Sequence, residues 1–127
     1  MSLDSNNLDQ IRRQIAEIAS QYGVFQCIEC SQAIKEFLLG INVKGKQVKL
    51  DLRRRDLPWS VIYDLRRGQQ IATNGYHEGI AIIIDGEEII FDNIDYGGVV
   101  RQEWLENLTS PTLELGMGSF QIAEEEF

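Results

Sequence analysis

The chain has 127 residues, of which 43% are hydrophobic and 25% charged, and we expect a single globular domain over residues 1–127. Twenty acidic against twelve basic side chains give a net charge of -8, which argues against a nucleic-acid partner because a phosphate backbone would be repelled. The sequence contains no apolar run near the roughly 20 residues of a membrane span, and its first ten residues do not resemble a signal peptide. We therefore expect a cytoplasmic protein without membrane contact.

Two amphipathic helices are predicted at the start of the chain. The first, over about residues 6–22, follows polar capping residues and repeats apolar side chains at the spacing of one helical face, with Gly23 as a natural terminator. The second, over about residues 27–39, places Ile34 and Phe37 on its buried side before Gly40. Only a few residues join the two helices.

From about residue 43 the apolar period changes from that of a helix to that of a strand. Val48, Leu50 and Leu52 alternate with polar residues, which predicts a half-buried strand. Further along, two apolar runs are joined by Asp85-Gly86, the type of dipeptide that tolerates the positive φ angles of a tight hairpin turn. This hairpin is the strongest β signal in the chain.

The remaining segments complete an α+β assignment. Residues 53–75 give no clear pattern, a short helix is expected near residues 101–107, and LELGMGSFQIA is expected to supply a last strand before an acidic tail. Two helices followed by a mostly antiparallel sheet over about residues 43–127 define the class.

Several conspicuous residues are given structural interpretations. Trp59 and Trp104 are expected to be core or rim aromatic residues rather than substrate platforms. Alternation along the strand is expected to turn Tyr76 and Glu78 away from the face of their neighbour His77. Turn and close-approach positions are expected at four glycines, the last two forming a flexible link: Gly75, Gly79, Gly97 and Gly98.

The single histidine and a nearby aspartate are candidates for a catalytic pair. His77 opens the first strand of the predicted hairpin, and Asp92 closes the second. For a turn centred on Asp85-Gly86, residues whose numbers sum to about 171 face one another, so His77 stands opposite about residue 94. A carboxylate at Asp92 is then expected to reach the imidazole, fix its tautomer and stabilise the imidazolium.

The two cysteines, Cys27 and Cys30, lie at the start of the second predicted helix. The first turn of a helix has unpaired N–H groups and a partial positive charge, which lower a cysteine pKa and can hold an oxyanion. Cys27 is expected at the first helical positions, whereas Cys30 lies one turn in and is more typical of a core residue. This favours Cys27 over Cys30 as a nucleophile, and the alternative that both are small buried hydrophobic residues stays open.

A helix-start cysteine, a strand-opening histidine and an aspartate after the next strand follow the order of the papain-like cysteine enzymes. The segments FQCIECSQAI, NGYHEGI, FDN and EWL resemble the papain-fold toxin domains of bacterial polymorphic toxin systems, of the type called papain-fold toxin 2, over about residues 22–108. The resemblance implies a papain-like fold with N-terminal helices on a mostly antiparallel sheet. It also implies a catalytic triad of Cys27, His77 and Asp92, with Asn93 as a substitute third member because papain has an asparagine there.

The resemblance further implies an activity and partners. A glutamine upstream of the cysteine helps to bind the oxyanion in papain-like enzymes, and both Gln21 and Gln26 are available, although Gln26 is equally placed to cap the helix. The implied activity is that of a thiol hydrolase or amidase on a protein or peptide, either a protease, a glutamine deamidase or a transferase. An immunity protein and delivery to other cells within a larger effector are implied as well, and no cofactor or metal is.

Three other interpretations stay open. Cys27, Cys30, His77 and Asp92 have the atom types of a zinc site, although structural zinc pairs usually lie on turns. A thioredoxin-like redox role fits less well, because that C-x-x-C follows a buried strand rather than a helix and a short polar link. The main non-enzymatic alternative is a catalytically inactive papain-like domain that serves as a binding module.

Overall fold

The computed structural model describes residues 5–54 and 57–127, and side chains from residue 7 onward in those ranges. The elements in chain order are α1 (Ser5–Ala19), α2 (Cys27–Gly40), β1 (Lys46–Asp51), β2 (Ile62–Asp64), β3 (Gln69–Ala72), β4 (Tyr76–Ile84), β5 (Glu87–Phe91), β6 (Val99–Val100), α3 (Arg101–Asn107), β7 (Leu108–Thr109), α4 (Pro111–Glu114) and β8 (Gln121–Glu126). The strand pairings of the described residues are antiparallel, so the predicted α+β class is confirmed.

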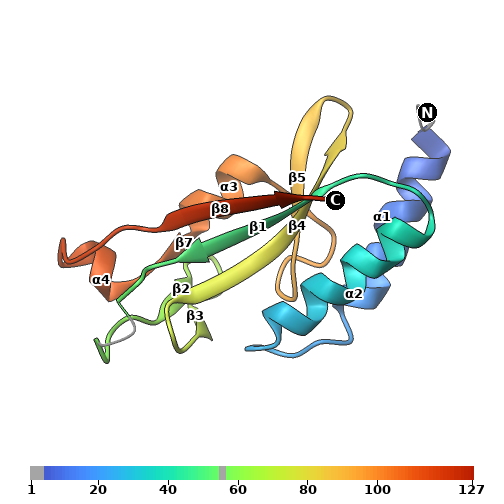
Figure 1. Cartoon of the computed structure of the whole chain (residues 1–127). Helices are drawn as coiled ribbons and strands as arrows, with labels where there is room; N and C mark the ends of the chain where they lie inside the picture. The colour runs from blue at the N-terminus through green and yellow to red at the C-terminus, as the bar shows by residue number, and fades with distance from the viewer. Residues whose placement is uncertain (1–4, 55–56) are drawn as a thin grey trace.

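The described residues form two sheets, a pair of N-terminal helices and two short helices, α3 and α4. The larger sheet has the order β6-β5-β4-β1-β8 and the smaller one the order β3-β2-β7. Helices α1 and α2 lie side by side at one side of the larger sheet, and α3 lies at its other side (Figure 1). No helix in the described part of the chain is long and apolar enough to cross a membrane.

Strand β4 lies at the centre of the larger sheet and separates two apolar cores. Ile80 and Ile82 belong to the core that includes residues of α1 and α2, whereas Ala81 belongs to the core that includes Trp104. Successive side chains of a strand point to opposite faces. His77 therefore faces the Trp104 side of the sheet, as Ala81 does, and Glu78 faces the helices.

The β4–β5 hairpin has the predicted turn. Asp85 and Gly86 have φ angles of 51° and 81°, and Ile80 pairs with Phe91, so paired residue numbers sum to 171 as expected. The ladder ends at this pair. Asp92 therefore follows β5 instead of closing it, and His77 pairs with Leu50 of β1.

Two predicted boundaries are wrong. The first helix ends at Ala19 rather than near residue 22, because the chain tightens there: Tyr22 N donates to Ala19 O at 3.2 Å. The acidic tail does not follow the last strand but forms the second half of β8. Its carboxylates are accommodated at this edge of the sheet because β8 pairs with β1, where Lys46 and Lys49 lie 3.5 and 3.1 Å from Glu124 and Glu125.

Gly98 is a close-approach position rather than a flexible link. Its φ is +85°, and an added Cβ would lie 2.6 Å from Phe91 Cε1 and 2.7 Å from Ile89 Cγ2. Gly98→Ala is expected to lower the free energy of unfolding by about 2–3 kcal/mol, through left-handed strain and overpacking. Urea denaturation measures this loss. Gly97→Ala is the matched control, since a Cβ there meets nothing within 4 Å, and equal stability of the two variants would contradict the prediction.

Candidate active site

His77 and Asp92 form a buried pair on the face of the sheet that carries Trp104. His77 Nε2 lies 2.8 Å from Asp92 Oδ2, with 0% and 1% of the two side chains exposed. The same Oδ2 accepts a hydrogen bond from Trp104 Nε1 at 2.8 Å. Asp92 Oδ1 accepts from the backbone N–H groups of Ile94 and Asp95. Four donors therefore fix the carboxylate in one orientation.

These contacts determine the charge of the pair. Burial raises the pKa of Asp92, but the hydrogen bond from His77 and the other donors outweigh burial and leave that pKa below its usual value. Burial also disfavours the charged form of His77 and so lowers its pKa. The hydrogen bond to Asp92 and the interaction with Cys27 outweigh burial and raise that pKa to about 10. The carboxylate of Asp92 therefore favours the protonated form of the His77 ring, and it also fixes which ring nitrogen faces away from Asp92.

Cys27 is the first residue of α2, and its side chain is 6% exposed. The N-cap residue, Gln26, makes no side-chain cap hydrogen bond. The N–H groups of the first turn are therefore not capped by Gln26 and can serve as donors. His77 Nδ1 is buried and has no hydrogen-bond partner among the described residues, while Cys27 is close enough to raise the pKa of His77. The arrangement leaves Nδ1 as the imidazole nitrogen that can exchange a proton with the thiol.

Cys30 lies in a different environment. It is 0% exposed and belongs to the apolar core that contains Ile34. Burial, followed by the nearby charges of Asp92, Cys27 and Glu78, raises the pKa of Cys30 to about 12. Cys30 is therefore a protonated core thiol at neutral pH.

Among the described residues, no group of three or more His, Cys, Asp or Glu side chains is arranged to hold a metal ion. Cys27 and Cys30 are both free thiols. Cys30 points into the apolar core and Cys27 lines a surface hollow, so the two do not share a coordination site. The zinc interpretation gains no support from this arrangement.

The residues proposed as substitutes lie around the loop that precedes α2. Asn93 Nδ2 donates to Gly23 O at 2.8 Å, and Gln26 Oε1 accepts from Gly23 N at 2.7 Å. Asn93 therefore anchors the loop, and it is Asp92 that contacts His77. Gln21 is exposed in the turn after α1. The Gln26 side-chain carbonyl group accepts a hydrogen bond from Gly23 and makes no capping hydrogen bond to α2.

Trp104 is a site residue that the sequence analysis treated only as a structural aromatic. Its side chain is fully buried, and its ring centroid lies 5.9 Å from that of His77 in a tilted arrangement. A buried indole N–H needs a hydrogen-bond acceptor. The sequence offered one signal for this contact. Asp92 lies only twelve positions before Trp104 and could accept a hydrogen bond from a buried indole.

Tyr76 and Glu78 are only partly where the strand alternation places them. Glu78 is buried on the helix side of β4, where Tyr76 Oη donates to its Oε1 at 3.0 Å and Gln47 Nε2 also donates to it. Tyr76 nevertheless lines a hollow together with Cys27. Tyr76 is the first residue of β4 and pairs with Asp51 of β1.

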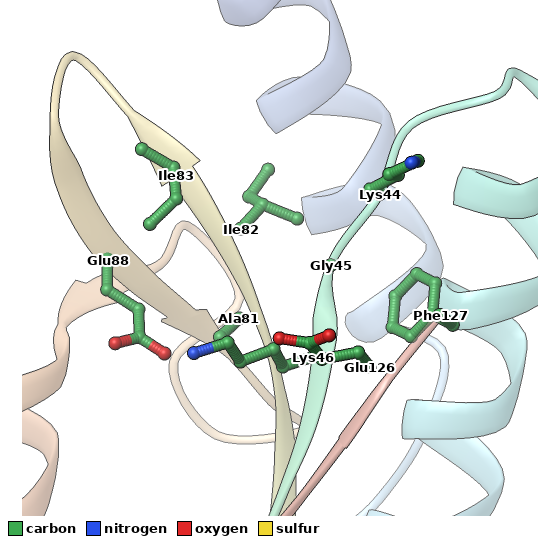
Figure 2. Close-up of a pocket in the computed structure, with 9 residues that line it drawn as sticks. All are labelled: Lys44, Gly45, Lys46, Ala81, Ile82, Ile83, Glu88, Glu126 and Phe127. Atoms are coloured by element: carbon green, nitrogen blue, oxygen red, sulfur yellow. The ribbon is translucent and has the colours of Figure 1, made fainter.

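Figure 2 shows a second hollow, of about 250 Å³, where β1 and β4 lie beside the end of the chain. Gly45, Ile82 and Phe127 are among its lining residues, whereas Cys27, His77 and Asp92 are not. The hollow that Cys27 lines is smaller, about 100 Å³, and lies between the start of α2 and the β3–β4 turn.

The fold and the site define an α+β domain in which a helix-start cysteine lies beside a buried histidine–aspartate pair. The chain belongs to the family described as papain fold toxin 2, whose sequence model matches residues 10–109. The resemblance predicted from the sequence is thereby confirmed. Comparison with curated proteins finds no match, and comparison with solved structures finds none either.

Proposed function

We propose that this toxin-family domain is a papain-like thiol hydrolase or amidase that acts on a peptide bond or a glutamine carboxamide of a protein substrate. The observation that carries the proposal is the orientation of His77. Its Nε2 is bonded to Asp92 at 2.8 Å, and its Nδ1 is unpartnered on a ring whose pKa responds to Cys27. This is the order of contacts that a nucleophile, a base and an orienting carboxylate require.

The proposed reaction begins with transfer of the Cys27 proton to His77 Nδ1. The thiolate then attacks the substrate carbonyl carbon, and the first-turn N–H groups of α2 hold the oxyanion. His77 returns the proton to the leaving amine or ammonia as the C–N bond breaks, which leaves a thioester on Cys27. Water, deprotonated by His77, attacks the thioester and releases the acid, and the proton returns to the thiol.

The alkylation of Cys27 tests this proposal without a known substrate. Iodoacetamide at mildly acidic pH is expected to label the wild type and a Cys30→Ala control once, and not to label Cys27→Ala, as measured by intact-protein mass spectrometry. Undiminished labelling of Cys27→Ala would refute the assignment of the nucleophile. An unreactive Cys27 in the wild type would instead favour the inactive binding module.

Substrate mass spectrometry distinguishes the two reactions. Incubation of glutamine-containing proteins with the wild type is expected to give either a mass gain of about one unit per site, from deamidation, or chain cleavage. Cys27→Ala is expected to give neither. Membership of a toxin family also supports delivery within a larger effector, and an immunity protein as the partner that blocks the site; binding of such a partner is expected to protect Cys27 from alkylation.

A further inference from the structure

The hollow beside Cys27 has an apolar side and an uncharged polar side. Phe25, Ile28, Ile71 and Ala72 form the apolar side, and residues of the β3–β4 turn and the start of β4 form the other. Within residues 5–54 and 57–127, no Asp, Glu, Lys, Arg or His residue lines it. A charged group that entered would lose its hydration without gaining an ionic partner. The hollow is therefore suited to an uncharged side chain.

Phe25 occupies this rim in an unfavourable backbone conformation. Its φ is +75°, in the left-handed region that favours glycine. Asn42, Arg53 and Asp85 also have positive φ, and of these Asn42 and Asp85 are residue types that tolerate it. The Phe25 side chain is 55% exposed, so its packing contributes little to offset the strain. Strained residues of this kind are found most often where the position itself has a function.

The loop holds Phe25 at a fixed position relative to the thiol. Asn93 and Gln26 bind the carbonyl and amide groups of Gly23, at 2.8 and 2.7 Å. Phe25 lies two residues before Cys27, and Ile28, which is 56% exposed, follows directly after it. Two exposed apolar side chains therefore flank the thiol in the chain. The loop that carries Phe25 is anchored through the carbonyl and the amide group of Gly23.

We propose that Phe25 and Ile28 form a specificity subsite that receives an aliphatic side chain next to the carbonyl attacked by Cys27. The inference rests on the proposed hydrolase activity and names its substrate class: proteins or peptides with a branched aliphatic residue beside the reacting bond. The hollow of about 100 Å³ is smaller than the ~150 Å³ cavity that accommodates a benzene ring, which favours an aliphatic group over a large aromatic one.

Two alkylating agents of similar length test the subsite. N-isobutyl iodoacetamide carries a branched aliphatic group, and N-(2-hydroxyethyl) iodoacetamide carries a polar one. The ratio of their rates with Cys27 is expected to fall about three- to tenfold in Phe25→Gly and in Phe25→Ala, because both variants lack the apolar wall. Phe25→Leu is expected to retain most of the ratio. Ile83→Ala, which shortens an exposed side chain outside this hollow, is the control and is expected to keep it.

Thermal unfolding separates a subsite from a purely structural role. Glycine relieves the left-handed strain and alanine does not, so Phe25→Gly is expected to melt above Phe25→Ala. If Phe25 served only the fold, the rate ratio would follow the melting temperature, and Phe25→Gly would resemble the wild type. That result, or an unchanged ratio in both variants while plain iodoacetamide labels wild-type Cys27, would overturn the subsite alone. Failure of iodoacetamide to label wild-type Cys27 would overturn the hydrolase proposal and the subsite together.

Discussion

Asp92→Ala is expected to lower the free energy of unfolding by about 3–5 kcal/mol and the rate of the proposed reaction by about 10³-fold or more. The stability loss arises because the substitution leaves the buried His77 ring and the Trp104 indole N–H without their acceptor. A buried donor that loses its partner costs its full desolvation energy. Denaturant unfolding measures the first effect, and the alkylation rate of Cys27 or turnover of a substrate measures the second.

Asp92→Asn is the isosteric companion of this variant. One carboxylate oxygen accepts from His77 and Trp104 and the other from the backbone of Ile94 and Asp95, so an amide NH₂ must face donors whichever way it turns. We expect Asp92→Asn to lie between the wild type and Asp92→Ala in stability. Asp9→Ala, an exposed aspartate on α1, is the control and is expected to change stability by less than about 0.5 kcal/mol. Wild-type stability of Asp92→Ala would contradict the description of the site.

Trp104→Ala is expected to have an effect of comparable size on stability, about 3–5 kcal/mol, because it removes a fully buried indole from the core. Trp104→Phe separates packing from hydrogen bonding. It keeps most of the apolar contact but removes the N–H group that Asp92 accepts at 2.8 Å, a hydrogen bond to a charged group worth about 1.5–3 kcal/mol.

Trp104→Phe is also expected to slow the alkylation of Cys27 by about tenfold, because Asp92 loses one of the donors that fix its orientation toward His77. Trp59→Phe is the matched control, since Trp59 is 36% exposed and its indole makes no hydrogen bond within the described residues. Alkylation of Trp104→Phe at the rate of the Trp59→Phe control would show that the indole N–H does not position the carboxylate.

Local patterns predicted much of the fold. The hairpin at Asp85-Gly86 and the start of α2 at Cys27 follow from turn chemistry and helical periodicity, which act over neighbouring residues. The extent of β8 could not be predicted this way. Its exposed acidic residues have no strand pattern of their own, and they extend the sheet because β1, some 75 residues earlier, supplies backbone partners and lysines.

Local patterns likewise predicted one part of the candidate site, and the other part depends on contacts between distant residues. Hairpin geometry brings His77 near Asp92 from sequence alone, and the order of residues suggests which thiol begins a helix. The depth of burial that distinguishes Cys30 from Cys27, and the indole that binds Asp92, depend on how α2 and α3 pack on opposite sides of the sheet. Those contacts join residues far apart in the chain, so no local pattern contains them.

The four donors to Asp92 have one further consequence, for the order in which the protein is made. His77 and the Ile94 and Asp95 amides are available soon after Asp92 is synthesised, but the indole of Trp104 follows twelve positions later, on a helix that must first dock. A nascent chain from which α3 has not yet emerged cannot complete the set of four donors around Asp92. Biosynthesis therefore places the assembly of the His77–Asp92–Trp104 contacts near the end of translation of the matched region.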